Sequence, residues 1–396
     1  MSADPQPANP FANYQYEIYL GGMAGQVPDH PVGWADLEQA AHDALEPGPR
    51  GYLFGGSGTE DTMRENLAAF SRHRIVPHML NDVSVRDLSR TVLGTELAAP
   101  VLTAPIGVQS ILHPEGELAS ARAAARAGVP AIASTASSFT LEEIAEAGGG
   151  APQWFQLYWP KGRELAESIV RRAETAGYKA LVVTLDTWLL GWRPRDLQQA
   201  YLPFLQGIGI ANYVQDPVFR STLAEPPEEN MQGAIGQFVG VFSNPSVTWT
   251  DLEWLRSITS LPIVLKGVLS ADDARRAVDA GVDGIIVSNH GGRQVDGAVA
   301  TLDALGPIVD AAGDDLAILL DSGVRSGSDG LKALALGADA VLLGRPCMWG
   351  LATGGEEGVL RVLRSFLAEL DLALALSGHT SVEELTPECL VASAGV

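Results

Sequence analysis

The chain of 396 residues is poor in cysteine and in cationic side chains. Its two cysteines, Cys347 and Cys389, lie far apart in the sequence, so they exclude a disulfide framework and a cysteine-rich metal cluster. We therefore expect no metal and a reducing, cytoplasmic setting. Lys and Arg number 26 against 48 Asp and Glu, and the formal net charge of −22 disfavours nucleic acid as a partner. An anionic substrate would need positive charge concentrated in its site.

Long apolar runs and targeting features are also absent from the sequence. No run of 18 or more apolar residues occurs, which argues against a transmembrane helix. The first fifteen residues, MSADPQPANPFANYQ, have neither the basic nor the apolar region of a secretory signal. We therefore expect no membrane association. Aromatic residues make up only 7% of the chain, so the core must rely on Ala, Val, Leu and Ile.

Residues 1–98 are expected to form an arm and helices that pack against the remainder. Residues 1–15 are rich in Pro, Asn and Ala and predict a loose arm. Residues 34–46 have helical spacing, and the Pro-Gly-Pro triplet at 47–49 is expected to end that helix. A glycine-rich turn, GYLFGGSGTED, and another helical stretch, TMRENLAAFSRH, follow.

From about residue 99 the sequence alternates between short apolar runs and Ala/Glu/Arg-rich helical stretches. Continuous apolar runs are typical of strands buried on both faces, and helical spacers indicate parallel βα units. A glycine precedes several runs, as expected where a helix hands the chain to a strand. Eight such units predict an α/β fold, a closed (β/α)₈ (TIM) barrel spanning 99–376. The runs are 99–107, 130–135, 153–159, 179–187, 261–267, 284–291, 317–323 and 340–346.

Residues 188–249, between the fourth and fifth runs, are too long for a simple crossover. They contain aromatic and Pro-rich pieces such as WLLGWRPRD and YLPFLQGIGIANY. A long insert in a compact domain is usually functional, and we interpret this one as an active-site lid. The alternative is an excursion used for packing or oligomer contacts. Residues 377–396 form a C-terminal tail.

Polar side chains follow nearly every predicted strand, at the end of a barrel where active sites form. The sharpest stretch is SNHGGRQ at 288–294, in which His290 suits a general base and Arg293 an anion clamp. The alternative is a structural histidine beside a Gly-Gly turn. The stretches LLDSGVRSG and LLGRP follow the last two runs, where barrels often bind phosphate, and they carry Arg325 and Arg345.

At these residues the chain resembles the FMN-dependent L-2-hydroxy acid oxidase family, which includes glycolate oxidase and lactate oxidase. The resemblance runs from about residue 16 to about residue 390, and GWRPRDL and NYVQDPVF are most similar to its lactate monooxygenase branch. It implies FMN as cofactor, a small 2-hydroxy acid and O₂ as reactants, and a homotetramer or homo-octamer. The other matching stretches are EIYLGG, APIGV, FQLYW, TLDTWLLGWRPRDL, SVTW, IVLKG, SNHGGRQ, DSGVRSG and GRP.

The resemblance also implies a catalytic role for matching residues. His290 would take the proton as the substrate is oxidised, and Asp186 would hydrogen-bond His290, favour its cationic form and raise its pKa. Arg193 and Arg293 would clamp the substrate carboxylate. Two tyrosines, Tyr52 and Tyr158, would hydrogen-bond the substrate from two sides.

A second group of matching residues would hold the cofactor. Lys266 would stabilise the negative charge of reduced flavin. The isoalloxazine would contact the APIGV stretch and several polar side chains, Asp321 would meet the ribityl chain, and glycines and arginines would hold the phosphate. The residues expected at the flavin ring are Pro105, Ile106, Gly107, Ser134, Gln156, Thr184 and Ser288, and those expected at the phosphate are Gly323, Arg325, Gly344 and Arg345.

The resemblance leaves two outcomes for the oxidation of L-lactate. A monooxygenase traps pyruvate until peroxide decarboxylates it to acetate, CO₂ and water, whereas an oxidase releases pyruvate and hydrogen peroxide. The insert and Gly107, where oxidases of the family usually carry Ala, favour the monooxygenase. Phe54 and residues 221–240 depart from the family pattern; Phe54 is expected to place a large ring near the site, so a larger substrate stays open.

Two other classes of protein fit the sequence less well. A phosphate-binding barrel enzyme without flavin, such as a nucleotide dehydrogenase, would need a catalytic cysteine in a mid-barrel loop, and neither Cys347 nor Cys389 lies in one. A non-catalytic barrel used as a scaffold would be indicated by loss of the base or the clamp, and His290, Arg193 and Arg293 are all present.

Overall fold

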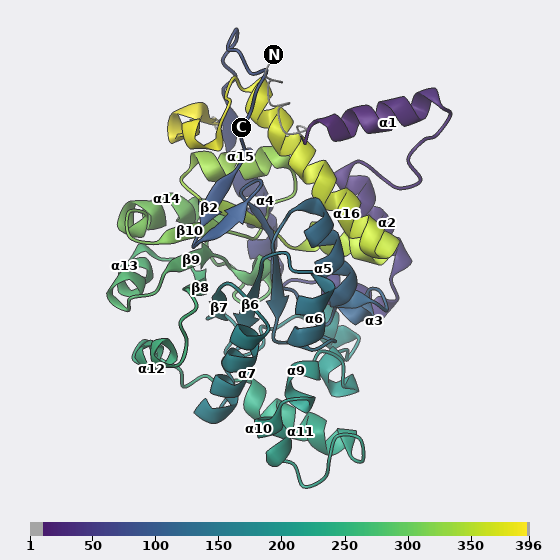
Figure 1. Cartoon of the computed structure of the whole chain (residues 1–396), viewed down its shortest axis with the longest axis vertical. Helices are drawn as coiled ribbons and strands as arrows, with labels where there is room; N and C mark the ends of the chain where they lie inside the picture. The colour runs from purple at the N-terminus through teal and green to yellow at the C-terminus, as the bar shows by residue number, and fades with distance from the viewer. Residues whose placement is uncertain (1–10, 394–396) are drawn as a thin grey trace, which may run out of the picture.

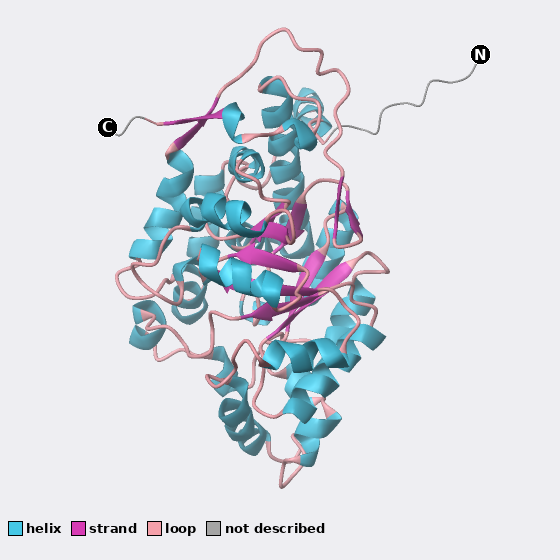
Figure 2. Ribbon diagram, turned by 90° about the vertical axis from the view of Figure 1, so that its left-hand side faces the viewer, coloured by secondary structure: helices cyan, strands magenta, loops and turns pink. Residues whose placement is uncertain are grey.

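The computed structural model describes residues 11–393 and shows a closed parallel barrel at its centre. The barrel order is β10-β11-β4-β5-β6-β7-β8-β9, so each of the eight predicted apolar runs supplies one strand, as expected. Figure 2 shows the strands gathered centrally and wrapped by helices. The barrel strands are β4 (Val101–Thr103), β5 (Ala131–Ser134), β6 (Gln153–Leu157), β7 (Leu181–Thr184), β8 (Ile263–Val268), β9 (Gly284–Val287), β10 (Ala317–Leu320) and β11 (Ala340–Leu343).

One helix or more follows each barrel strand and covers its outer side. In α7 the buried residues Leu165, Ile169, Val170 and Ala173 recur at helical spacing, which turns one face of this helix towards the strands. The predicted glycine endings are confirmed, since Gly128 ends α5 in the left-handed conformation. The outer helices are α5 (Gly116–Ala127), α6 (Leu141–Ala147), α7 (Arg163–Thr175), α12 (Asp251–Ile258), α13 (Ala271–Asp279), α14 (Thr301–Ala312), α15 (Gly327–Ala335) and α16 (Arg345–Leu376).

Two apolar layers form the core. The larger lies between the strands and the helices, and a smaller one fills the barrel interior with Leu102, Ile132 and Trp154 among others. The hairpin of β2 (Arg90–Val92) and β3 (Thr95–Leu97) adds Val92 and Leu97 to the interior layer. The barrel interior is therefore packed, and open space is left at the carboxyl ends of the strands.

The N-terminal segment forms helices that pack on the barrel, with one difference from expectation. The predicted helix, α2, ends at Ala44, before the Pro-Gly-Pro triplet, as expected. The same triplet then begins a separate helix, α3 (residues 47–54), with proline in its first turn, where a missing N–H costs nothing. The first four residues of the predicted glycine-rich turn, 51–54, are thus helical. The other elements are α1 (Asn13–Met23), α2 (Trp34–Ala44), α4 (Asp61–Ser71) and β1 (His73–Ile75), which pairs antiparallel with β12 (Leu390–Ala392) of the tail. The first ten residues of the predicted arm lie outside the described residues.

The insert after β7 is largely helical and lies at one pole of the molecule, below the barrel in Figure 1. Along residues 11–393 no helix is long and apolar enough to cross a membrane. The helices of the insert are α8 (Pro194–Gln198), α9 (Ala211–Val214), α10 (Pro217–Ser221) and α11 (Met231–Phe242), with a 3₁₀ turn, η2 (Pro203–Gln206), between the first two.

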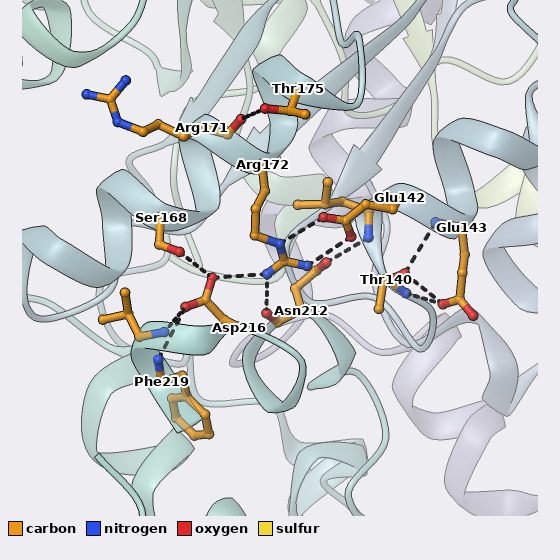
Figure 3. A network of polar contacts seen from close by, with 12 residues as sticks. Thr140, Glu142, Glu143, Ser168, Arg171, Arg172, Thr175, Asn212, Asp216 and Phe219 are labelled. Carbon is orange, nitrogen blue, oxygen red and sulfur yellow. Dashed lines mark hydrogen bonds and ion pairs between the residues drawn. The ribbon is translucent and has the colours of Figure 1, made fainter. Parts of the chain in front are cut away.

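Buried polar contacts fasten the middle of the insert to the barrel (Figure 3). Asp216 caps α10 and accepts hydrogen bonds from Ser168 and Arg172 of α7. The Asn212 amide group donates to the Thr135 carbonyl oxygen, and its own oxygen accepts from the Leu141 amide. The segment 211–219 is therefore a fixed anchor, and any movement of the insert as a lid must occur on either side of it.

Candidate active site

A large cavity opens where the carboxyl ends of the barrel strands meet. Its empty space, including the opening to solvent, is about 1150 Å³. Loops after β4, β6, β7, β9, β10 and β11, Lys266 of β8, the end of α3 and the insert all supply lining residues. Most of the predicted site residues line it: Tyr52, Pro105, Ile106, Gly107, Tyr158, Arg193, Lys266, His290, Arg293, Asp321, Gly323, Arg325, Gly344 and Arg345.

Five of the predicted residues lie behind the cavity wall and do not line it. Asp186 is bonded to His290, and Ser288 accepts a hydrogen bond from Lys266. The other three form a buried chain, in which the Ser134 hydroxyl donates to the Gln156 side-chain oxygen at 2.9 Å and the Gln156 amide donates to the Thr184 hydroxyl at 2.9 Å. Asp186 and Ser288 are thus linked by one hydrogen bond to a residue that lines the cavity, and the other three residues are linked to one another.

His290, which follows β9, is held by the carboxylate of Asp186, which follows β7, two strands away around the barrel. Its Nδ1 lies 2.8 Å from Oδ1 of Asp186, and we assign the proton to Nδ1, so that Nε2 is the free acceptor. Thr187 completes the group, because its hydroxyl donates to the same Asp186 oxygen at 2.7 Å and lies 3.2 Å from His290 Nδ1. The imidazole is thereby fixed in orientation and tautomer.

Burial controls the protonation of this pair. Burial is the largest influence on the pKa of His290 and lowers it; Lys266 and Arg193 act in the same direction, and together they outweigh Asp186, which raises it. The predicted rise of the His290 pKa is therefore wrong in net direction. Burial opposes ionisation of Asp186, but His290 and Lys266 overcome it and bring the Asp186 pKa to about 2. The pair is a neutral imidazole beside a carboxylate near neutral pH.

Gly267, next to Lys266 in β8, occupies a position that only glycine fits. Its φ is +108°, a conformation that other residues rarely adopt, and a Cβ there would come within 2.9 Å of the Asp186 carboxylate. The glycine leaves room for Asp186 to reach His290.

Two arginines and two tyrosines line the cavity together: Arg193, Arg293, Tyr52 and Tyr158. Arg293 donates to the Tyr52 and Gly55 carbonyl oxygens, and its guanidinium carbon lies 4.9 Å from the centre of the Tyr52 ring. Arg193 donates to the Arg293 carbonyl oxygen and to the Gln294 side chain. Burial, followed by Arg293, lowers the pKa of Arg193 to about 10, so it stays cationic. Burial and Asp186 raise the pKa of Tyr158, which keeps its hydroxyl protonated.

Lys266 lies at the cavity floor as a buried cation. Its ammonium group donates to the Ser288 hydroxyl at 2.8 Å and lies 3.2 Å from Oδ2 of Asp321. Burial alone would lower its pKa, but Asp321 and Asp186 raise it above the ordinary value. Lys266 is therefore a permanent positive charge under the cavity.

The far end of the cavity carries two half-buried guanidiniums, Arg325 just before α15 and Arg345 at the start of α16. Arg345 is the first residue of α16 and donates to the carbonyl oxygens of Leu53, Gly55 and Gly291. Arg325 lies over the Trp349 ring at 5.1 Å. Burial lowers the pKa of both, and Arg293 and Arg325 add to the effect on Arg345. Cations without an ionic partner at a helix N-terminus form a site for phosphate.

Several cavity residues were not predicted. Thr187 and Gln294 are neutral polar residues, and only their contacts with the His290 pair and with Arg193 give them a role. Leu190, Phe204 and Phe242 of the insert also line the cavity. Phe54, expected near the site, does not line it; its ring stacks on Trp349, and Leu53 lines the cavity instead. The helical turn of α3 directs successive side chains to different sides.

The donor set fits FMN. The helix start with Arg325 and Arg345 suits a phosphate, Asp321 suits a polyol, and Lys266 beside the Ser134–Gln156–Thr184 chain suits the polar edge of a flavin. Fold and site together are suited to a barrel enzyme with a phosphorylated cofactor, and they offer a neutral histidine and two guanidiniums beside the place for that cofactor.

Comparison with known proteins gives the family. A model described as FMN-dependent dehydrogenase matches residues 41–392. An L-lactate oxidase of Lysinibacillus sphaericus is 45% identical over 381 residues, covering 96% of this chain and 97% of the relative. Human 2-hydroxyacid oxidase 1 is 44% identical over 351 residues, covering 88% and 93%. A mandelate oxidase crystal structure superposes with a TM-score of 0.82 at 42% identity, covering 92% and 99%. The chain belongs to the FMN-dependent 2-hydroxy acid oxidase family, and its activity is FMN-dependent oxidation of a 2-hydroxy acid.

Proposed function

We propose that this chain oxidises L-lactate, or a similarly small L-2-hydroxy acid, with O₂ and acts as a lactate 2-monooxygenase that releases acetate, CO₂ and water. The observation that carries the proposal is the composition of the cavity wall. Leu190, Phe204 and Phe242 of the insert line the cavity together with the loop of Gly107, so that the insert encloses the space in which a product would remain.

The clamp residues bind and orient the substrate. Arg193 and Arg293 hold the substrate carboxylate, because a guanidinium offers a planar pair of donors matched to a carboxylate. Tyr52 and Tyr158 hydrogen-bond the substrate from two sides. The Tyr158 hydroxyl is neutral and can donate without losing its proton.

His290 takes the proton of the substrate at Nε2. Asp186 accepts the hydrogen bond from Nδ1 and stabilises the imidazolium that forms. FMN, when bound, accepts the two electrons of the substrate and passes them to O₂. Lys266 provides a buried positive charge at the cavity floor, which would stabilise the negative charge of the reduced cofactor.

Retention of the first products decides the outcome. Pyruvate and hydrogen peroxide that stay together react to give acetate, CO₂ and water, so an enclosed cavity favours the monooxygenase. A second candidate is an oxidase that releases pyruvate and hydrogen peroxide, which the similarity to a relative named L-lactate oxidase supports. A homotetramer or homo-octamer is the assembly that we expect, and light scattering of the purified protein measures it.

A single turnover of the FMN-loaded protein distinguishes the two candidates. The protein is reduced with one equivalent of L-lactate, mixed with O₂ and quenched, and the products are separated. Acetate and CO₂ in amounts equal to the lactate consumed would support the monooxygenase. Pyruvate with hydrogen peroxide would reject it in favour of the oxidase.

A further inference from the structure

Glu117 is a buried carboxylate behind the active-site cavity that the reaction described above does not use. It is the second residue of α5, and only 3% of its surface is exposed. Its Oε1 accepts two backbone hydrogen bonds, from the amide of Gln109 at 2.9 Å and from the amide of Ser138 at 3.1 Å. One oxygen atom thus joins two segments that are far apart in the sequence.

Both segments are loops that build the cavity wall. The loop after β4 contributes Gly107 and Val108, and the loop after β5 contributes Ala136. The Val108 amide donates to the Ala136 carbonyl oxygen at 2.9 Å, and the Gln109 side chain donates to the Ile106 carbonyl oxygen. The Glu117 carboxylate is therefore placed to set how closely the two loops approach.

The second oxygen of Glu117, Oε2, has no hydrogen-bond partner among the described residues. Glu117 also lines a separate small cavity, which has room for about one water molecule. Serine and threonine side chains, Ser120, Ser134 and Thr103, line the same space. A buried carboxylate oxygen with no partner is costly unless a water or a proton satisfies it.

The charges near Glu117 are few. The one other titratable residue that lines the small cavity is Cys347 of α16, and burial raises the pKa of its thiol to about 12. Arg122 of α5 is paired with Glu115 and with Glu356 of α16. Burial raises the pKa of Glu117 to about 7 against the opposing effect of the Gln109 and Ser138 amides.

We propose that Glu117 is a positioning residue for the oxidation: its ionised carboxylate ties the loop 104–112 to the loop 135–139, and uptake of a proton loosens this tie. A carboxylate accepts an amide hydrogen bond more strongly than a neutral carboxyl group does. The loop that carries Gly107 is therefore held more firmly on the alkaline side of the Glu117 titration than on the acid side.

Hydrogen–deuterium exchange of the FMN-loaded protein tests the proposal without substrate. Peptides that cover residues 105–112 and 135–140 are followed from pH 6 to pH 8, and observed rates are divided by the intrinsic rates at each pH. We expect protection of both peptides to rise roughly tenfold over this range, the difference between a charge-assisted and a neutral hydrogen bond. Glu117→Gln, which stays neutral, should hold both peptides at the acid-side level, and Glu146→Gln on the exposed face of α6 should behave as the parent protein.

Activity provides a second measurement. The pH profile of kcat should lose a step near pH 7 in Glu117→Gln, whereas the affinity for FMN should stay within about twofold of the parent, because the amide oxygen still accepts both hydrogen bonds. Protection that does not change with pH in the parent protein would overturn the proposal. Protection in Glu117→Gln that follows the parent at every pH would overturn it as well, and neither result depends on which hydroxy acid is the substrate.

Discussion

The arginines on the outside of the molecule differ from those in the cavity. Outside, Arg122 pairs with Glu115 and Glu356, and Arg220 pairs with Glu228. In the cavity, no salt bridge to a carboxylate forms within residues 11–393, and the guanidiniums donate instead to carbonyl oxygens and to Gln294. The four cavity arginines are Arg193, Arg293, Arg325 and Arg345.

The cavity arginines do not lack carboxylate partners because carboxylates are scarce, since the chain has a net charge of −22. Leaving buried guanidiniums without carboxylates costs free energy, and burial lowers the pKa of Arg193, Arg325 and Arg345 accordingly. Anionic groups of the ligands, the FMN phosphate and the substrate carboxylate, would supply the missing partners. The cavity therefore keeps its cationic side chains available to bind anionic ligands.

The largest effect should come from the one group whose role is to move a proton. His290→Ala should slow anaerobic flavin reduction by about a thousandfold, because general-base catalysis contributes about 10²–10⁴. FMN should stay bound, since His290 is outside the set of phosphate-binding cations. Stopped-flow reduction at saturating L-lactate measures the rate. Reduction at the parent rate would remove His290 as the base.

The next largest effect should appear when a cofactor-side arginine is removed. Arg345→Met should weaken FMN binding by about a hundredfold or more, since hydrogen bonds to charged groups contribute about 1.5–3 kcal/mol each. Arg220→Met, which breaks an exposed pair, is the control and should leave FMN affinity unchanged. Equal FMN affinity in both variants would contradict the claim that the cavity arginines bind FMN and the exposed arginines do not.

A substrate-side arginine should give a smaller and different effect. Arg293→Lys keeps the charge but loses the planar pair of donors, so we expect the KM for L-lactate to rise by roughly tenfold while FMN stays bound. Steady-state kinetics with air-saturated buffer measures this change. An unaltered KM would show that Arg293 serves only its contacts with the Tyr52 and Gly55 carbonyl oxygens.

Gly107 lies on the wall opposite the clamp and tests product retention. A Cβ at this position would come within 2.3 Å of the Ala136 carbonyl oxygen, so Gly107→Ala must displace the loop. We expect products to shift from acetate towards pyruvate and peroxide, with FMN retained. The ratio of the two acids after one turnover measures the shift, and the same ratio as in the parent would show that this position does not control retention.

The smallest effect concerns pH. The pKa of His290 lies below 6.5 in this structure because burial, Lys266 and Arg193 outweigh Asp186. The base must be neutral to accept a proton, so kcat/KM should fall only as the pH drops through this lowered pKa. A limb of the profile centred above pH 6.5 that persists in Glu117→Gln would contradict the assignment.

Local pattern was sufficient to predict the barrel, and the family resemblance supplied half of the residues that line the cavity. Continuous runs such as 284–291 are buried on both faces, and that property is visible in a sequence. Pro47 and Pro49 correctly marked the end of α2, but the start of α3 at the same prolines was not predicted, because whether a proline also begins a helix depends on packing.

Other features of the site depend on contacts across the fold. Thr187 and Gln294 have no distinctive chemistry of their own, and their roles arise from a distance of 3.2 Å to His290 and 2.7 Å to Arg193. The direction of the His290 pKa was missed because a carboxylate partner can be inferred from sequence, whereas the extent of burial and the approach of Lys266 cannot. The hydrogen bond between Glu117 and Ser138 likewise joins residues that are 21 positions apart in the sequence, and no local pattern indicates it.

Anaerobic titration of the purified, FMN-loaded protein with L-lactate tests the central claim most directly. We predict that the yellow flavin absorbance bleaches fully and saturably, and that Arg293→Lys needs more L-lactate for the same bleaching. A protein that binds no FMN, or one whose bound flavin stays oxidised with L-lactate and with larger L-2-hydroxy acids alike, would contradict the account.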